Sequence, residues 1–115
     1  RHRFLTLLLP LGRRDLRGAP AVTEISDGRT VGWSIRTGGR EVLVVAPRTG
    51  PGFERDGHAC TGRLLVSVRR RGIVTTFCAI GARSAAVPGW QPVRADQPAF
   101  ILGELTDGGR KISAE

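Results

Sequence analysis

Tyrosine, asparagine and methionine are all missing from this 115-residue sequence, and Lys111 is its only lysine. The absence of tyrosine removes a common general acid or base from the candidates for catalysis. The absence of asparagine means that these residues contain no acceptor for N-linked glycosylation. A chain that starts at Arg1 and has no methionine is expected to be processed, or to be part of a longer protein.

Long apolar runs are also scarce. The run Leu7–Leu9 ends at Pro10, whereas a membrane span needs roughly 20 apolar residues. Arg13, Arg14 and Asp15 follow too soon after this run for a signal peptide. The sequence therefore predicts no membrane association.

Cysteine is limited to Cys60 and Cys78, which are 18 residues apart. This separation lacks the closely spaced pairs of a zinc site. Two interpretations stay open, namely two free and partly buried thiols or one disulfide across neighbouring strands. No cluster of possible ligands has metal-binding spacing, so we expect neither a metal nor a cofactor.

The charge of the chain comes almost wholly from arginine. Eighteen basic and ten acidic residues give a net charge of +8. Residues 1–57 hold ten basic and six acidic residues, and residues 58–115 hold eight and four, so each half has a net charge of +4. An even spread of charge argues against a dedicated nucleic-acid-binding arm. Genomic base composition can also favour arginine over lysine.

Apolar residues alternate with polar ones at the period of β-strands. The segment Thr30–Thr37 places Val31, Trp33 and Ile35 on one face, which predicts a half-buried strand with Trp33 in the core. No segment has the periodicity of a long helix. The expected strands span residues 4–9, 21–25, 30–37, 41–46, 63–68, 73–80, 82–87, 99–105 and 111–114.

Turn residues separate these strands. Asp27-Gly28 predicts a type I′ hairpin turn, and Gly38-Gly39 turns the chain again. Residues 48–62 are expected to form the longest loop and the first place to look for function. Pro98 is expected to begin a strand. Residues 1–115 are thus predicted to form a single domain, an antiparallel β-sandwich of about eight or nine short strands.

The succession of four segments resembles the C-terminal β-domain of heparinase II/III-like polysaccharide lyases, a group that includes alginate-lyase-type enzymes. The resemblance covers most of the chain, although each motif is weak alone because strand-turn-strand patterns are common. The segments are Arg3–Pro10, Ile25–Arg29 with the Trp33 strand, Thr61–Val66 and Asp96–Phe100.

This resemblance implies a larger bacterial protein with an upstream α/α-toroid catalytic domain, in the periplasm or secreted. Its reaction would be that of a carbon–oxygen lyase, in which a base removes the C5 proton of a uronic acid and an acid protonates the leaving oxygen. Tyrosine and histidine usually serve in these roles. No residue here matches a catalytic position of the family, so this chain is expected to be a non-catalytic C-terminal part that supports the catalytic domain.

Five residues are candidates for ligand binding. Arg69, Arg70 and Arg71 form the densest positive feature, in a predicted hairpin turn between residues 63–68 and 73–80. They could bind an anionic partner, or simply keep a sheet edge soluble. Trp90 could stack on a sugar or pack against the end of the sandwich. His58 lies in the long loop near Cys60, a pair too weakly patterned to indicate nucleophilic catalysis.

Two functions stay open from the sequence. One is the supporting β-domain of a polysaccharide lyase, with acidic polysaccharide as a candidate partner. The alternative is an independent carbohydrate- or nucleic-acid-binding module that uses its arginine-rich surface. Sparse aromatic residues, four Phe and two Trp, argue against nucleic acid as the partner.

Overall fold

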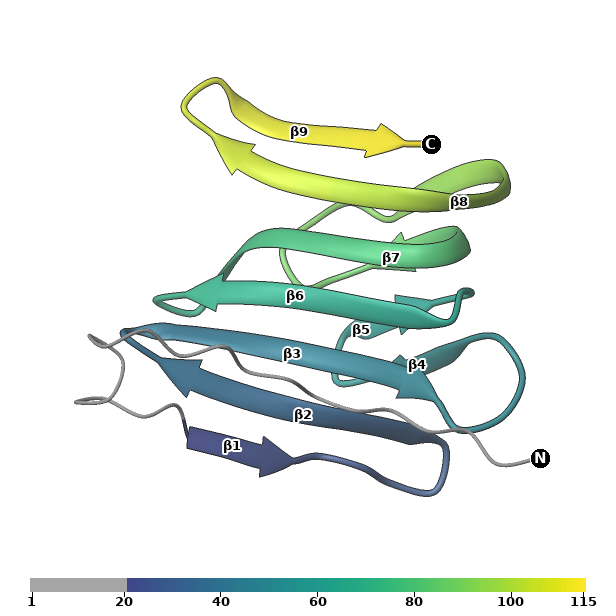
Figure 1. The fold of residues 1–115 in the computed structure, drawn as a ribbon. Helices are drawn as coiled ribbons and strands as arrows, with labels where there is room; N and C mark the ends of the chain where they lie inside the picture. The colour runs from purple at the N-terminus through teal and green to yellow at the C-terminus, as the bar shows by residue number, and fades with distance from the viewer. Residues whose placement is uncertain (1–20) are drawn as a thin grey trace.

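The computed structural model describes residues 21–115, which form nine strands and, within that range, no helix (Figure 1). The strand expected at residues 4–9 lies outside the described residues. The strands are β1 (Ala21–Glu24), β2 (Thr30–Thr37), β3 (Arg40–Pro47), β4 (Phe53–Arg55), β5 (His58–Cys60), β6 (Leu64–Arg70), β7 (Ile73–Ala86), β8 (Val93–Thr106) and β9 (Gly109–Ala114).

All nine strands belong to one antiparallel sheet. Its order is β1-β2-β3-β6-β7-β5-β4, and β8 pairs with both β7 and β9. Strand β7 has three partners because it is long enough for β6 and β5 to pair with different parts of it. The predicted all-β antiparallel fold of eight or nine strands is confirmed.

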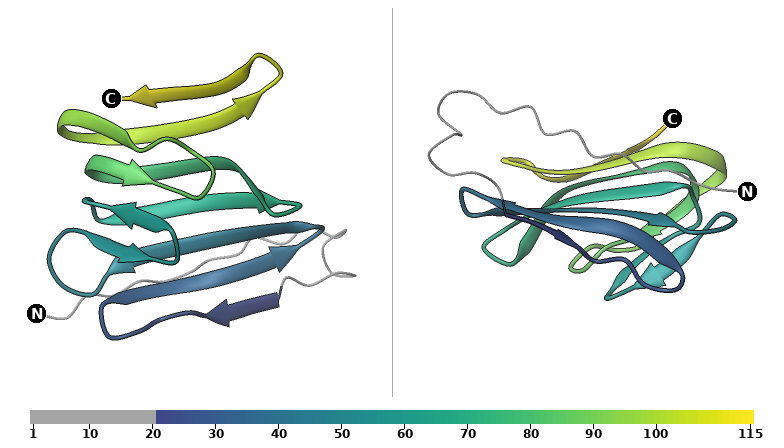
Figure 2. Two further views of the ribbon diagram at one scale, coloured as in Figure 1. Left: turned by 180° about the vertical axis from the view of Figure 1, so that it is seen from behind. Right: turned by 60° about the horizontal axis from the view of Figure 1, so that its bottom comes forward.

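The sheet curls because β7 bends in its middle. Gly81 has a positive φ of 65°, and the register with β8 shifts on both sides of Ala82. Beyond the bend, β7 pairs with β5 through Ala85 and Ala86. The β4–β5 hairpin is thereby folded beneath the main part of the sheet, as the tilted view of Figure 2 shows. The separate strand expected at residues 82–87 is the second half of this bent strand.

The two faces of the sheet follow from its register. We call the face with the opposed residues Val45, Leu65, Ala79 and Ile101 the inner face. The opposite face is the outer face. Leu65 packs with Cys60 of β5 in one buried cluster, which places the β4–β5 hairpin against the inner face.

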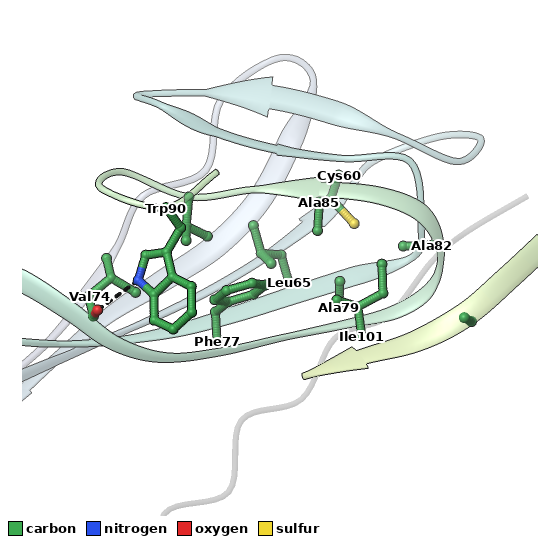
Figure 3. Packing of buried hydrophobic residues seen from close by; sticks show 11 residues of the cluster. Cys60, Leu65, Val74, Phe77, Ala79, Ala82, Ala85, Trp90 and Ile101 are labelled. Carbon is green, nitrogen blue, oxygen red and sulfur yellow. Dashed lines mark hydrogen bonds between the residues drawn. The ribbon is translucent and has the colours of Figure 1, made fainter. Parts of the chain in front are cut away.

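The core is centred on Phe77, which is 1% exposed. Trp90 packs edge-on against it, with ring centroids 5.2 Å apart and planes at 82°. The Trp90 Nε1–H donates to the Val74 carbonyl at 2.9 Å, so the polar atom of this indole is satisfied (Figure 3). Ile101 and Ala79 belong to the same buried cluster and are each 0% exposed.

Trp33 lies on a different face from the one expected. Gly32 and Ser34 are buried on the inner face, whereas Trp33 is half-buried on the outer face opposite Val44. Period-two spacing separates the two faces of a strand but does not say which one meets the main core. The prediction that Trp33 belongs to the core was therefore wrong, because Trp33 stands on the face that points away from the main core.

The hairpin at Asp27-Gly28 is closed by a different turn from the predicted type I′ turn. Strands β1 and β2 pair as predicted, but neither Asp27 nor Gly28 has a positive φ. Instead, Asp27 Oδ1 accepts hydrogen bonds from the backbone N–H groups of Arg29 and Thr30, both at 2.8 Å. The side chain of Asp27 thus closes the turn, as Asx turns do.

The long loop expected at residues 48–62 contains a second Asp-Gly hairpin. Asp56 and Gly57 have φ values of 47° and 80° and join β4 to β5. This dipeptide is a strong hairpin signal, and the sequence prediction missed it because the flanking strands are only three residues each.

Pro98 lies inside a strand rather than at its start. Strand β8 begins at Val93, and its pairing to β7 shifts between Arg94 and Ala99. Proline has no N–H to give to the ladder, so this irregular stretch tolerates it.

Replacing Gly103 is expected to disturb the core. A Cβ atom at this position would lie 2.3 Å from Phe77 Cε1, so Gly103→Ala should lower the free energy of unfolding by about 1–3 kcal/mol through overpacking. Urea denaturation measures this change. Gly108→Ala is the matched control, because its Cβ would meet only Thr106 Oγ1 at 3.8 Å. Equal stability of both variants would contradict the packing described here.

Candidate functional site

A cavity of about 500 Å³ lies between the inner face of the sheet and the β4–β5 hairpin. Strands β1, β2, β3 and β6 form one wall, and the hairpin forms the other. The residues that line this cavity are Thr23, Ile25, Ser34, Arg36, Glu41, Leu43, Val45, Arg55, Asp56, His58 and Arg69.

One cross-strand row places two arginines on either side of a glutamate. Arg36 of β2 is opposite Glu41 of β3, and Glu41 is opposite Arg69 of β6. Residues directly opposed in antiparallel strands share a face, so the register alone brings these three side chains to the same end of the cavity.

Glu41 ties this row together. Its Oε2 accepts from Arg36 Nε at 2.9 Å and from Ser34 Oγ at 3.3 Å, and its Oε1 lies 3.8 Å from Arg69 NH1. The hydrogen bond from Arg36 is the main reason that the pKa of Glu41 is below its usual value. Glu41 therefore stays ionised and orients the arginines at neutral pH.

Arg55 enters the cavity from the hairpin. Its NH1 donates to Thr30 Oγ1 at 3.1 Å and lies 3.7 Å from Asp27 Oδ2, while its Nε lies 3.6 Å from Asp56 Oδ2. Backbone hydrogen bonds, first of all from Arg29, lower the pKa of Asp27. The turn carboxylate therefore holds Arg55 in place while part of its guanidinium stays available.

Within residues 21–115, Arg69 keeps guanidinium donors that have no hydrogen-bond partner. Its side chain is 33% exposed, and its approach to Glu41 is too long for a hydrogen bond. No side-chain hydrogen bond joins Arg69 to any other residue of the described range 21–115. A half-buried guanidinium with free N–H groups can bind a carboxylate or sulfate through two parallel hydrogen bonds.

His58 closes the inner end of the cavity but has little freedom to react. It is 4% exposed, its Nδ1 lies 3.2 Å from the Asp56 carbonyl, and its Nε2 lies 3.2 Å from Ser67 Oγ. A carbonyl only accepts, so Nδ1 carries the proton and Nε2 accepts from the serine. Burial lowers the pKa of His58. The imidazole is neutral and fully hydrogen-bonded.

A second cavity of about 460 Å³ adjoins the first and shares Arg36, Glu41 and Arg69 with it. Arg40 and Arg71 are added here, beside the glycines of the β2–β3 and β6–β7 turns. Arg71 has a positive φ of 51° and is the first residue of its turn. Together the two cavities form an arginine-lined surface that we call the arginine groove.

The structure brings three of the five predicted site residues to this groove. Arg69 and His58 line the first cavity, and Arg71 lines the second. Arg70 is exposed and lines neither of these two cavities. Trp90 is 8% exposed, so of its two alternatives the packing one holds, and it is not a platform for a sugar.

Sequence reasoning missed Arg36, Arg40 and Arg55. Each is an isolated arginine in the sequence, and only the register and the folded hairpin place them near Arg69. The Arg36–Glu41 pair flanks the predicted Gly38-Gly39 turn, so pairing across that turn is the signal that could have found it.

Both cysteines are free thiols, as one of the two interpretations predicted. Cys60 is buried in the core, and Cys78 is half-buried on the outer face. Between residues 21 and 115, no group of three or more histidine, cysteine or acidic side chains is placed to hold a metal ion. Over the same range, no helix is long and apolar enough to cross a membrane.

Comparisons with known proteins add no family to this description. No protein-family model matches the chain, and no curated protein matches it.

The buried neutral state of His58 predicts a dependence of stability on pH. Because its pKa is lowered from 6.5 in the folded protein, the unfolded chain binds the proton more readily. Stability is therefore complete above about pH 6.5 and falls as the pH drops toward the folded pKa. Urea midpoints measured from pH 7 to pH 5 should decrease, and His58→Asn should flatten this decrease.

The pH range in which His58 affects stability differs from the range in which the carboxylates do. Asp27 and Glu41 have pKa values lowered from 3.8 and 4.5, so their contributions are lost only below these values. An identical slope between pH 7 and pH 5 in the wild type and His58→Asn would show that another group titrates.

Proposed function

We propose that this chain is a non-catalytic β-domain of a heparinase II/III-like polysaccharide lyase, and that its arginine groove binds the carboxylates or sulfates of an acidic polysaccharide. The chemistry of elimination then belongs to an upstream catalytic domain of the same parent protein. The resemblance of the four sequence segments supports the family, and the groove supports the choice of ligand.

The observation on which this proposal rests is the grouping of five arginines along the arginine groove, three of which lie beside an acidic side chain. Arg55, Arg36 and Arg69 surround the first cavity, and Arg40 and Arg71 continue the series into the second. Only Glu41 and Asp56 oppose them among the lining residues. A polymer with one anionic group on each sugar presents several charges at once, which suits a group of arginines better than a single small anion does.

The lining of the groove favours a saccharide over a nucleic acid. Single-stranded nucleic acids are held by bases stacked on aromatic rings, and neither cavity is lined by a phenylalanine or tryptophan. Phe77 and Trp90 are buried, and Trp33 lies on the outer face. Recognition by arginines alone reads charge and its spacing rather than the stacking of rings.

The environment of His58 supports a binding role rather than catalysis. Both of its ring nitrogens have partners, and the chain has no tyrosine to serve as the second proton-transfer group. Elimination at a uronic acid needs a free base near the C5 proton. Among residues 21–115 the groove offers arginines for charge neutralisation, and its two carboxylates, Glu41 and Asp56, each lie beside an arginine.

Loss of Arg55 or Arg69 should weaken binding to oligo-uronates such as alginate fragments. Each substitution to alanine removes a charge-assisted contact, which is equivalent to roughly a tenfold rise in Kd. Isothermal titration calorimetry at two salt concentrations measures this change. The affinity of the wild type should fall as salt rises, because these contacts are partly exposed.

Two control variants separate specific binding from general attraction. Arg94→Ala removes the same charge from a different cavity and should leave Kd unchanged. Glu41→Gln removes one of the opposing carboxylates and should lower Kd. Equal weakening in Arg55→Ala, Arg69→Ala and Arg94→Ala, or equal affinity for single-stranded DNA and oligo-uronate, would refute specific binding in the groove.

A further inference from the structure

The outer face of the sheet carries a continuous apolar row. Trp33, Val44, Val66, Cys78 and Leu102 are successive cross-strand partners from β2 to β8. Because they are opposed in register, their side chains all stand on the same face. No charged residue interrupts this row over five neighbouring strands.

More apolar surface flanks the row. Val22 pairs with Ile35 at the β1 edge, and Phe100 and Ile80 stand on the outer face at the alternate positions to Ile101 and Ala79. Val22 and Phe100 are each 44% exposed and Ile80 is 37% exposed, whereas Ile35 on the same face is 5% exposed. Exposed apolar side chains grouped on one face of a sheet mark a surface that another element can cover.

The second layer of the described fold lies on the other side. Cys60 of β5 and Trp90 belong to the same buried cluster as Leu65 and Phe77 of the inner face. The outer face therefore resembles half of a β-sandwich, for which the usual partner is another apolar strand or sheet about 10 Å away.

We propose that residues 4–9 of this same chain, Phe-Leu-Thr-Leu-Leu-Leu, pack across the outer face and complete that layer. Five of the six residues are apolar, so the segment offers apolar side chains on both sides in an extended conformation. This inference goes beyond the polysaccharide-binding function and does not depend on it.

The connection to β1 is long enough for this arrangement. Eleven residues, 10–20, separate Leu9 from Ala21, and they span up to roughly 36 Å when extended. The distance from β1 to β7 is four strand spacings, or about 19 Å. A tether of this length holds the segment at millimolar effective concentration, which favours it over a second copy of the chain at ordinary protein concentrations.

The alkylation rate of Cys78 reports whether the outer face is covered. It lies in the middle of the apolar row, whereas Cys60 is buried in the inner core. In the full chain, Leu7→Glu/Leu8→Glu should disrupt the contact and speed alkylation of Cys78 by iodoacetamide at least roughly tenfold. Leu11→Glu/Leu16→Glu adds the same charge outside residues 4–9 and should leave the rate unchanged.

Three results would overturn the proposal. These are an unchanged rate in Leu7→Glu/Leu8→Glu, an equal acceleration in the control pair, and protection of Cys78 that increases with protein concentration. The last result would assign the face to a second copy. The reactivity of Cys60 reports global unfolding in the same experiment.

If Leu7→Glu/Leu8→Glu unfolds the protein, disulfide trapping tests the same contact without added charge. In a Cys60→Ala background, each of Leu5→Cys, Thr6→Cys, Leu7→Cys, Leu8→Cys and Leu9→Cys is oxidised mildly at low protein concentration. A disulfide with Cys78 needs Cβ atoms about 3.8 Å apart, so packing predicts an intramolecular bond at one or two alternate positions. Absence of an intramolecular bond at all five positions would overturn the proposal.

Discussion

The bend of β7 at Gly81 is the constraint on which the rest of the structure depends. A straight strand would leave β5 beyond the edge of the sheet, whereas the bent strand returns it over the inner face. The positive φ at Gly81 is a conformation that glycine adopts without strain. Packing of Trp90 on Phe77, fixed by the hydrogen bond to the Val74 carbonyl, then covers the inner face near the first half of β7.

The same folding-over creates the candidate site. His58 of the hairpin hydrogen-bonds Ser67 of β6 and so anchors the second layer to the first. Arg55, three residues earlier, is brought to the cavity that Arg69 and Arg36 line from the sheet. Each arginine is held by an acid that only partly neutralises it. In the proposed anion-binding role, Glu41 and Asp27 would lower the affinity for anions, but they would keep the guanidinium groups oriented before a ligand arrives.

The sequence predicted the strands better than their layering. Alternation and glycine turns identified the all-β antiparallel fold, yet they could not choose the face of β2 that meets the main core, because the residues buried on that face, Gly32 and Ser34, are not apolar. The Arg69–Arg71 cluster could be recognised in the sequence as a run of arginines. Arg36 could not be assigned to the same site, because only the register of two strand pairs brings it near Arg69. Long-range pairing is the information that local patterns lack.

Our central claim is that the folded hairpin and the sheet together make one anion-binding groove. Its most direct test is a titration of the arginine Nε–Hε resonances of the full chain with an alginate oligosaccharide. We predict that Arg36, Arg55 and Arg69 shift together and saturate, while Arg94, in a separate cavity, stays unchanged. Shifts of similar size at every arginine, without saturation, would contradict the account.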